Sequence, residues 1–98
     1  MATFITTMHF TETGIKSVRD TCERAAAFKA TAKKIGVKVT GLYWTLGAFD
    51  GVIVCEAPDE ETATAALLHL GALGNIRTQT ARAYDAAEMQ KILGLVPK

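Results

Sequence analysis

The sequence predicts an α+β fold in which one antiparallel sheet carries two helices. The spacing of apolar residues changes between the strand period and the helix period along the chain, in the order β-α-β-β-α-β. Start and stop residues flank the helical stretches, and a short glycine-containing turn joins the two middle strands. With 98 residues, the chain has room for one core, so we expect a single domain over residues 1–98.

The first strand is expected from Thr3 to Phe10, a short stretch rich in β-branched and aromatic residues. A helix is expected within residues 13–35, kinked near Asp20, with Thr21 as a second N-cap. Lysines in its last turn and the glycine that follows them are typical of a helix end.

The second strand is expected over Val37 to Leu46, and its apolar pattern changes phase at Gly41. A β-bulge at Gly41 would place all the apolar residues of this strand on one face, whereas without it both faces are partly apolar. The sequence leaves both alternatives open. The residues concerned are Val37, Val39, Leu42, Trp44 and Leu46.

The third strand, Val52 to Glu56, follows a turn at residues 47–51 and is apolar on both faces. Val52 and Val54 point to one side of this strand, while Ile53 and Cys55 point to the other. A strand of this kind requires cover on both sides, which is typical of a central position in a sheet.

The second half of the chain repeats the helix and strand signals. Asp59 is expected to cap a helix whose apolar stripe ends near residues 71–75. The fourth strand is expected over Ile76 to Tyr84, and Asp85 then caps a short helix. The inward side of this last helix is expected to carry Met89, Ile92 and Leu93.

This order predicts a ferredoxin-like sandwich in which the first and third strands are central. We expect the small residues Ala81 and Ala83 on the helix-packed face, which would send Thr78, Thr80 and Arg82 to the other face.

The other face of such a sheet lacks cover. It is expected to expose Val52 and Val54, or else Ile53 and Cys55, together with some of Phe4, Met8 and Trp44. At about 25 cal/mol per Å², this exposure forgoes several kcal/mol, which is comparable with the whole stability of a small domain. A homodimer or higher oligomer packed sheet to sheet is therefore predicted. The alternative is cover by the terminal helix, residues 85–94.

Three segments resemble the small bacterial proteins of the GYD-domain family: TFITTMHFTETGIKSVRD, GAFDGVIVCEAPDEETA and LGALGNIRTQTARAY. The resemblance implies a dimeric α/β barrel, in which two ferredoxin-like sheets enclose a cavity. The tyrosine of the family's name is Phe49 here, between Gly47 and Asp50, so a role that needs a phenol at this position fails in this chain. The resemblance brings no activity and no catalytic residues.

Several classes of protein are disfavoured. A net charge of +1 and a third strand without aromatic residues argue against nucleic-acid binding. His9 and His69 have no metal ligands at suitable spacing, so neither a metal nor a cofactor is expected. The separated Cys22 and Cys55, an N-terminus without a secretory signal and the lack of a long apolar run predict a cytoplasmic protein without membrane contact.

The candidate pocket residues are His9, Tyr43, Trp44, Asp50, Thr78 and Arg82. His9 suits proton transfer, or it bonds to backbone at a strand end. Arg82 suits an anion, although a structural pairing with Asp50 or Glu56 is favoured. Three functions stay open: a binding module for a small apolar ligand, a cofactor-independent enzyme with His9 as base and Arg82 as oxyanion stabiliser, and a structural assembly unit.

Overall fold

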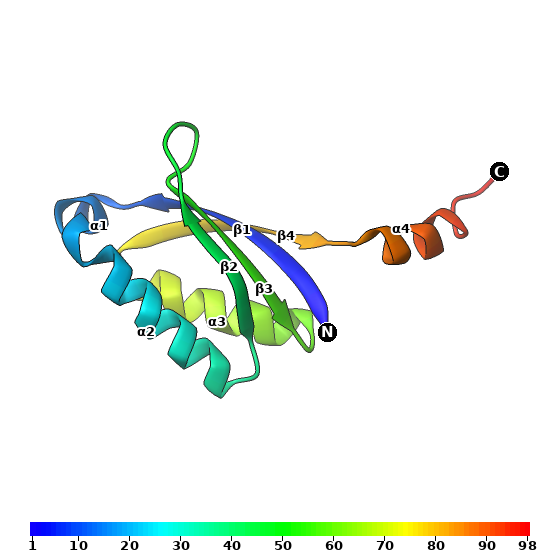
Figure 1. Ribbon diagram of the computed structural model, residues 1–98, viewed down its shortest axis with the longest axis horizontal. Coiled ribbons are helices and arrows are strands. Elements are labelled where there is room, and N and C mark those ends of the chain that lie inside the picture. Colours follow the sequence, from blue (N-terminus) through cyan, green and yellow to red (C-terminus); the bar gives the residue numbers. More distant parts are fainter.

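The sheet contains four antiparallel strands in the order β2-β3-β1-β4 (Figure 1). The computed structural model describes residues 1–98 and places the strands at Ala2–Phe10 (β1), Lys38–Trp44 (β2), Gly51–Ala57 (β3) and Ile76–Ala83 (β4). The two strands predicted to be central, β1 and β3, pair with each other in the middle of the sheet. The predicted ferredoxin-like α+β fold is confirmed.

The first helical stretch is divided into three parts, α1 (Glu12–Lys16), a 3-10 turn (Val18–Asp20) and α2 (Thr21–Lys34). This division confirms the expected kink near Asp20. The prediction that Thr21 caps α2 is wrong, because Asp20 holds the N-cap position and makes no side-chain capping bond. The Thr21 hydroxyl instead accepts a hydrogen bond from the Trp44 indole N–H at 3.0 Å, which ties α2 to β2.

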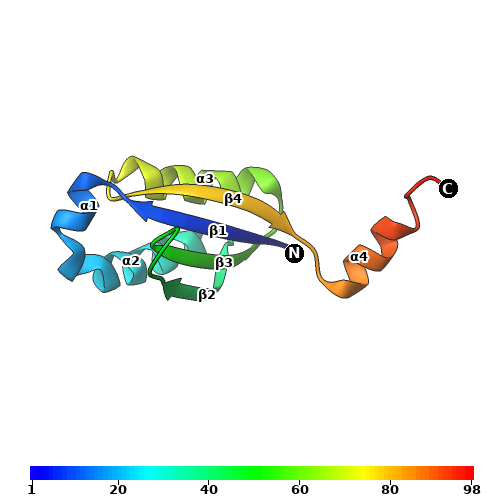
Figure 2. The same ribbon diagram turned by 90° about the horizontal axis from the view of Figure 1, so that it is seen from above.

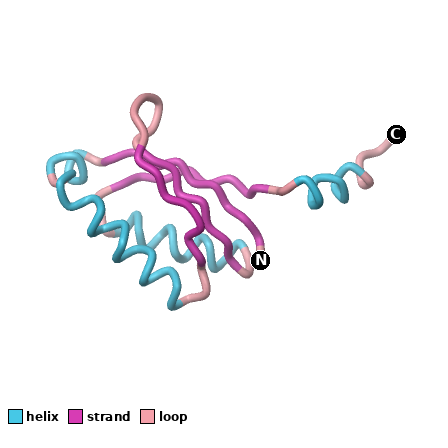
Figure 3. The backbone as a smooth tube through the Cα atoms, in the orientation of Figure 1, coloured by secondary structure: helices cyan, strands magenta, loops and turns pink.

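The second main helix, α3 (Glu60–Ala72), begins as predicted. The Asp59 carboxylate accepts a hydrogen bond from the backbone N–H of Thr62 at 2.7 Å. Bonding to Thr62 holds the pKa of the Asp59 carboxyl below its ordinary value. Figure 3 shows α2 and α3 together on one side of the sheet. None of the helices is long and apolar enough for a membrane span.

A β-bulge in β2 settles the alternative that the sequence left open. The register of β2 against β3 shifts between Val39 and Gly41. As a result Val39 and Leu42 both pack against the helix-side core, although strict alternation would place residues three positions apart on opposite faces. Leu46 lies in the loop beyond the strand and is fully exposed, so the bulge does not bring it to this face.

The core lies between the sheet and the two main helices. Alternate residues of β1 and β3 enter it, including Phe4, Met8, Ile53 and Cys55. The expectation that some of Phe4, Met8 and Trp44 would lie on the uncovered face is wrong, because all three lie on the helix side of the sheet. Cys55 is a free thiol, and burial raises its pKa. The other members of the cluster are Phe28, Ala32, Val37, Ala57, Ala63, Ala66, Leu70 and Ile76.

The predicted orientation of β4 is wrong. Arg82 pairs with the buried Phe4, and Thr80 pairs with the buried Thr6 through a hydroxyl contact of 2.8 Å. Arg82 and Thr80 therefore face the helix side, and Ala81 faces the open side with Ala83. The helix side of this edge strand tolerates polar residues because it lies beside α3 at the margin of the helical layer, along a groove open to solvent.

The last helix, α4 (Ala86–Leu93), extends away from the sheet in the direction in which β4 ends (Figure 2). The prediction of an inward face is wrong, because none of its residues is buried and Met89 and Leu93 are 47% and 54% exposed. Its first turn is bonded to Arg82 at the end of β4, and the helix otherwise extends clear of the sheet. Cover of the open face by the chain's own tail is thereby excluded in this structure.

Candidate interaction surface on the open sheet face

The face of the sheet opposite α2 and α3 is the candidate functional surface, and we call it the open face. Strand alternation and register define its members. They are Thr3, Ile5, Thr7 and His9 of β1, Val52, Val54 and Glu56 of β3, Arg77, Gln79, Ala81 and Ala83 of β4, and Lys38 and Tyr43 of β2.

The centre of the open face is apolar. Ile5 of β1 lies between Val54 of β3 and Ala81 of β4, and it is 42% exposed. Val52 lies beside Tyr43, whose side chain is also exposed. An apolar patch at the middle of a sheet without cover is typical of an interaction site. The sequence left open whether Val52 and Val54 or Ile53 and Cys55 lie on this face, and the structure places the valines here. Ile5 was not among the expected residues.

Charged and polar groups lie around this apolar centre. Lys38 and Glu56 are paired positions at one end of the open face, and His9 and Arg77 are paired positions at the other end. An apolar centre with a polar rim is the usual composition of a protein–protein interface.

His9 and Asp50 attach the β2–β3 loop to the end of β1. The His9 Nε2 lies 2.9 Å from the carbonyl oxygen of Ala48. The Asp50 carboxylate accepts a hydrogen bond from the Phe10 N–H, and the Asp50 N–H donates to the Met8 carbonyl, both at 2.8 Å. These contacts agree with the interpretation of His9 as a strand-end residue bonded to backbone.

Arg82 makes a structural pairing, but with a partner that the sequence did not indicate. Its guanidinium lies 3.2 Å from the Glu88 carboxylate and 4.5 Å from the centre of the Tyr84 ring. It also donates to the backbone carbonyls of Thr3 and Ala83. The expected partners were Asp50 and Glu56. Glu56 lies on the opposite face of the sheet, and Asp50 lies at the far end of β1.

The six candidate pocket residues do not meet within one chain. His9 and Tyr43 are on the open face, Trp44, Thr78 and Arg82 are on the helix side, and Asp50 is in the loop. Arg82 pairs with Phe4, which precedes His9 in β1 by five residues, a separation of about 17 Å along the strand. A single chain therefore does not present His9 as a base and Arg82 as an oxyanion stabiliser to one substrate.

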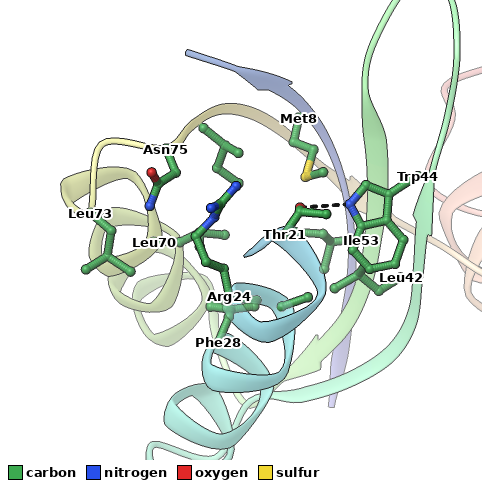
Figure 4. A pocket seen from close by; sticks show the side chains of 12 residues that line it. Met8, Thr21, Arg24, Phe28, Leu42, Trp44, Ile53, Leu70, Leu73 and Asn75 are labelled. Atoms are coloured by element: carbon green, nitrogen blue, oxygen red, sulfur yellow. Dashed lines mark hydrogen bonds between the residues drawn. The ribbon is translucent and has the colours of Figure 1, made fainter. Parts of the chain in front are cut away.

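Two hollow spaces lie beside the helix side of the sheet. A cavity of about 40 Å³ lies between α2 and the sheet, lined by Met8, Arg24 and Trp44 among others (Figure 4). This volume has room for a few water molecules. A shallow groove of about 480 Å³ runs between α3 and β4, where Thr78 and Arg82 line it. No group of three or more metal-ligating side chains lies close enough together to hold a metal ion.

The comparisons with known proteins agree with this fold. The model of the GYD domain matches residues 4–93, and the chain belongs to this family. A curated relative from Thermus thermophilus is 33% identical over 90 residues, which are 91% of this chain and 95% of that protein. Its name is glutamine synthetase and cystathionine beta-lyase binding protein.

Two solved structures show the same fold at low sequence identity. The crystal structure of TTHA0845 from Thermus thermophilus matches with a TM-score of 0.57 and 19% identity, over 88% of this chain and 96% of that one. The crystal structure of MtbAldR matches with a TM-score of 0.63 and 13% identity over 86% of this chain. This chain spans about half of MtbAldR, 53% of its length.

Proposed function

We propose that this GYD-domain protein is a non-catalytic binding module, folded as a single domain, that acts as a homodimer joined through its open faces and binds other proteins. The observation that supports it is the apolar centre of the open face, around Ile5, Val52 and Val54, which no part of the chain covers. Two such sheets packed face to face form the dimeric α/β barrel expected of the family.

Burial of the open face provides a driving force for the dimer. Each aliphatic side chain that becomes fully buried contributes about 1.5–3 kcal/mol. Ile5, Val52 and Val54 on each copy contribute in this way, but association itself costs about 4–15 kcal/mol. The open face therefore specifies where two copies meet, while the affinity depends on what else the interface buries.

The proposal of protein partners is supported by the name of the Thermus relative, which refers to two enzymes. A dimer joined through the open faces leaves α2 and α3 outermost, where they remain accessible to a partner. We expect the purified protein to bind the glutamine synthetase or the cystathionine beta-lyase of its own organism in isothermal titration calorimetry, and serum albumin serves as the control. The concentration of each enzyme should be about 100 µM, which is far above the dissociation constants of most specific complexes. If neither enzyme gives a heat of binding, this part of the proposal is contradicted.

Replacement of Ile5 by lysine is expected to abolish the dimer. The charge would lie at the centre of two apposed apolar faces, and burial of an unpaired ammonium is expected to raise the dimer dissociation constant at least about 100-fold. The monomer should still fold, because this side chain is 42% exposed in the isolated chain. Sedimentation velocity at micromolar concentration measures the change.

Leu68→Lys is the matched control for that substitution. Leu68 lies on α3, away from the open face, and is 68% exposed. The same change in charge and size should therefore leave the dimer intact. A wild-type protein that sediments as a monomer, or an Ile5→Lys variant that dimerises as well as the wild type, would refute the open face as the interface.

A small apolar ligand enclosed between the two sheets is a second proposal. Thr3, Thr7 and Gln79 lie among the apolar residues of the open face and would offer hydrogen bonds to such a molecule. A native mass spectrum of the dimer, prepared from its own cells, that contains only twice the mass of the chain would exclude it.

A further inference from the structure

The C-terminal segment from Tyr84 to Val96, here called the arm, contains a helix in which no residue is buried. Its helix α4 begins with a capping box, in which the Asp85 carboxylate accepts from the Glu88 N–H at 2.8 Å and the Glu88 carboxylate accepts from the Asp85 N–H at 3.1 Å. An isolated helix of eight residues is marginal in water and needs tertiary contacts. The arm therefore requires a surface that its own chain does not supply.

One side of the arm is apolar. Within α4, Met89, Ile92 and Leu93 follow the i, i+3, i+4 spacing that places residues on one side of a helix, and the apolar Val96 follows shortly after the helix ends. Met89, Leu93 and Val96 are about half exposed, at 47%, 54% and 57%. Gln90 and Lys91 lie on the other side. This is the pattern of a helix that packs one side against a neighbour.

The direction of the arm is held by Arg82 at the end of β4. Its guanidinium bonds to Glu88 in the first turn of α4 and stacks on Tyr84 at the start of the arm, while Phe4 of the core lies 5.7 Å away on the sheet. A salt bridge to Glu88 and one aromatic contact with Tyr84 therefore connect the arm to the body. The arm is thus presented outward in a defined direction.

The area of the open face indicates which molecule receives the arm. Four strands about 4.8 Å apart and about 25 Å long give a footprint of roughly 500 Å². A stable interface buries about 800 Å² on each partner. Charged residues at both ends of the open face reduce its apolar share further, so a dimer needs additional contact area. The exposed apolar residues of the arm can supply it.

We propose that the arm of each copy packs through Met89, Ile92, Leu93 and Val96 on the body of the second copy, in a reciprocal exchange that completes the dimer interface. This inference rests on the proposed homodimer. It assigns to the C-terminal segment a function that is separate from the stability of the single domain, because no residue of α4 is buried in its own chain.

The double variant Met89→Gln/Leu93→Gln tests the exchange. Glutamine favours a helix about as much as these residues do, so α4 keeps its propensity while its apolar side is lost. We expect the dimer dissociation constant, measured by sedimentation, to rise at least about tenfold, which corresponds to about 1.4 kcal/mol. The control Gln90→Ala/Lys91→Gln changes the polar side of the same helix and should leave the constant within about twofold.

Cross-linking between isotopically light and heavy copies gives a second, independent readout. An amine-reactive cross-linker applied to a mixed dimer is expected to join Lys91 of one copy to a lysine in the body of the other, such as Lys16 or Lys38. The arm exchange is refuted if the Met89→Gln/Leu93→Gln variant dimerises as well as a dimeric wild type. It is also refuted if the cross-links of Lys91 join only residues of the same copy. In both cases the proposed dimer itself is not contradicted. If the wild type is monomeric, the proposed dimer itself fails.

Discussion

Replacement of Gly14 by alanine is expected to destabilise the fold by about 3 kcal/mol, at the upper end of the usual cost of overpacking. A Cβ atom at this position would lie 1.9 Å from the carbonyl oxygen of Asn75 and 2.8 Å from its carbonyl carbon. The neighbour cannot move away freely, because the same carbonyl accepts a hydrogen bond from the Thr11 N–H at 3.0 Å. The free energy of unfolding in urea, extrapolated to water, measures this loss.

Gly71→Ala is the control, and it is expected to change stability in the opposite direction. Gly71 lies inside α3, and a Cβ atom there would meet nothing within 4 Å. Alanine in a helix is favoured over glycine by about 0.5–1 kcal/mol because it restricts the unfolded backbone. If both variants shift the urea midpoint in the same direction, the close approach of Gly14 to Asn75 does not limit this part of the fold.

Replacement of Phe28 by alanine is expected to cost about 3–5 kcal/mol, which approaches the whole stability of a small domain. Phe28 is the aromatic residue through which α2 enters the core, and it is only 4% exposed. Its ring borders the small cavity between α2 and the sheet, so its removal would enlarge an existing space rather than allow the helix to close in. Thermal unfolding followed by circular dichroism checks the loss.

Ile35→Ala is the matched control for Phe28→Ala. Ile35 is the C-cap residue of the same helix and is 46% exposed, so its truncation is expected to cost less than about 1 kcal/mol. Equal effects of the two substitutions would show that α2 is not anchored through Phe28.

Much of the fold was predictable from short stretches of sequence. The capping residue Asp59, the kink before α2 and the apolar character of β3 depend on neighbours a few residues away, and the structure confirms each of them. The central position of β3 was predictable because a strand that is apolar on both sides is stable only with strands beside it and cover on its faces.

The candidate site was less predictable, because its residues are brought together by strand register. The side chains of β4 alternate between the two faces of the sheet, but the residues near β4 in the sequence do not indicate which side chains face the helices. The orientation of β4 follows from its register with β1, in which Thr80 pairs with Thr6 and Arg82 pairs with Phe4. Arg82 consequently bonds to Glu88 of α4, a residue that was not considered as its partner.

By itself, the sequence determined the order of the elements and the approximate ends of most of them, because capping, turn geometry and apolar periodicity act over a few residues. Only the tertiary structure decided which apolar residues are left exposed, that β2 bulges next to Gly41 and that α4 extends away from the sheet. These outcomes depend on register between strands far apart in the chain and on where β4 ends. A side chain's own neighbours in the sequence do not specify either.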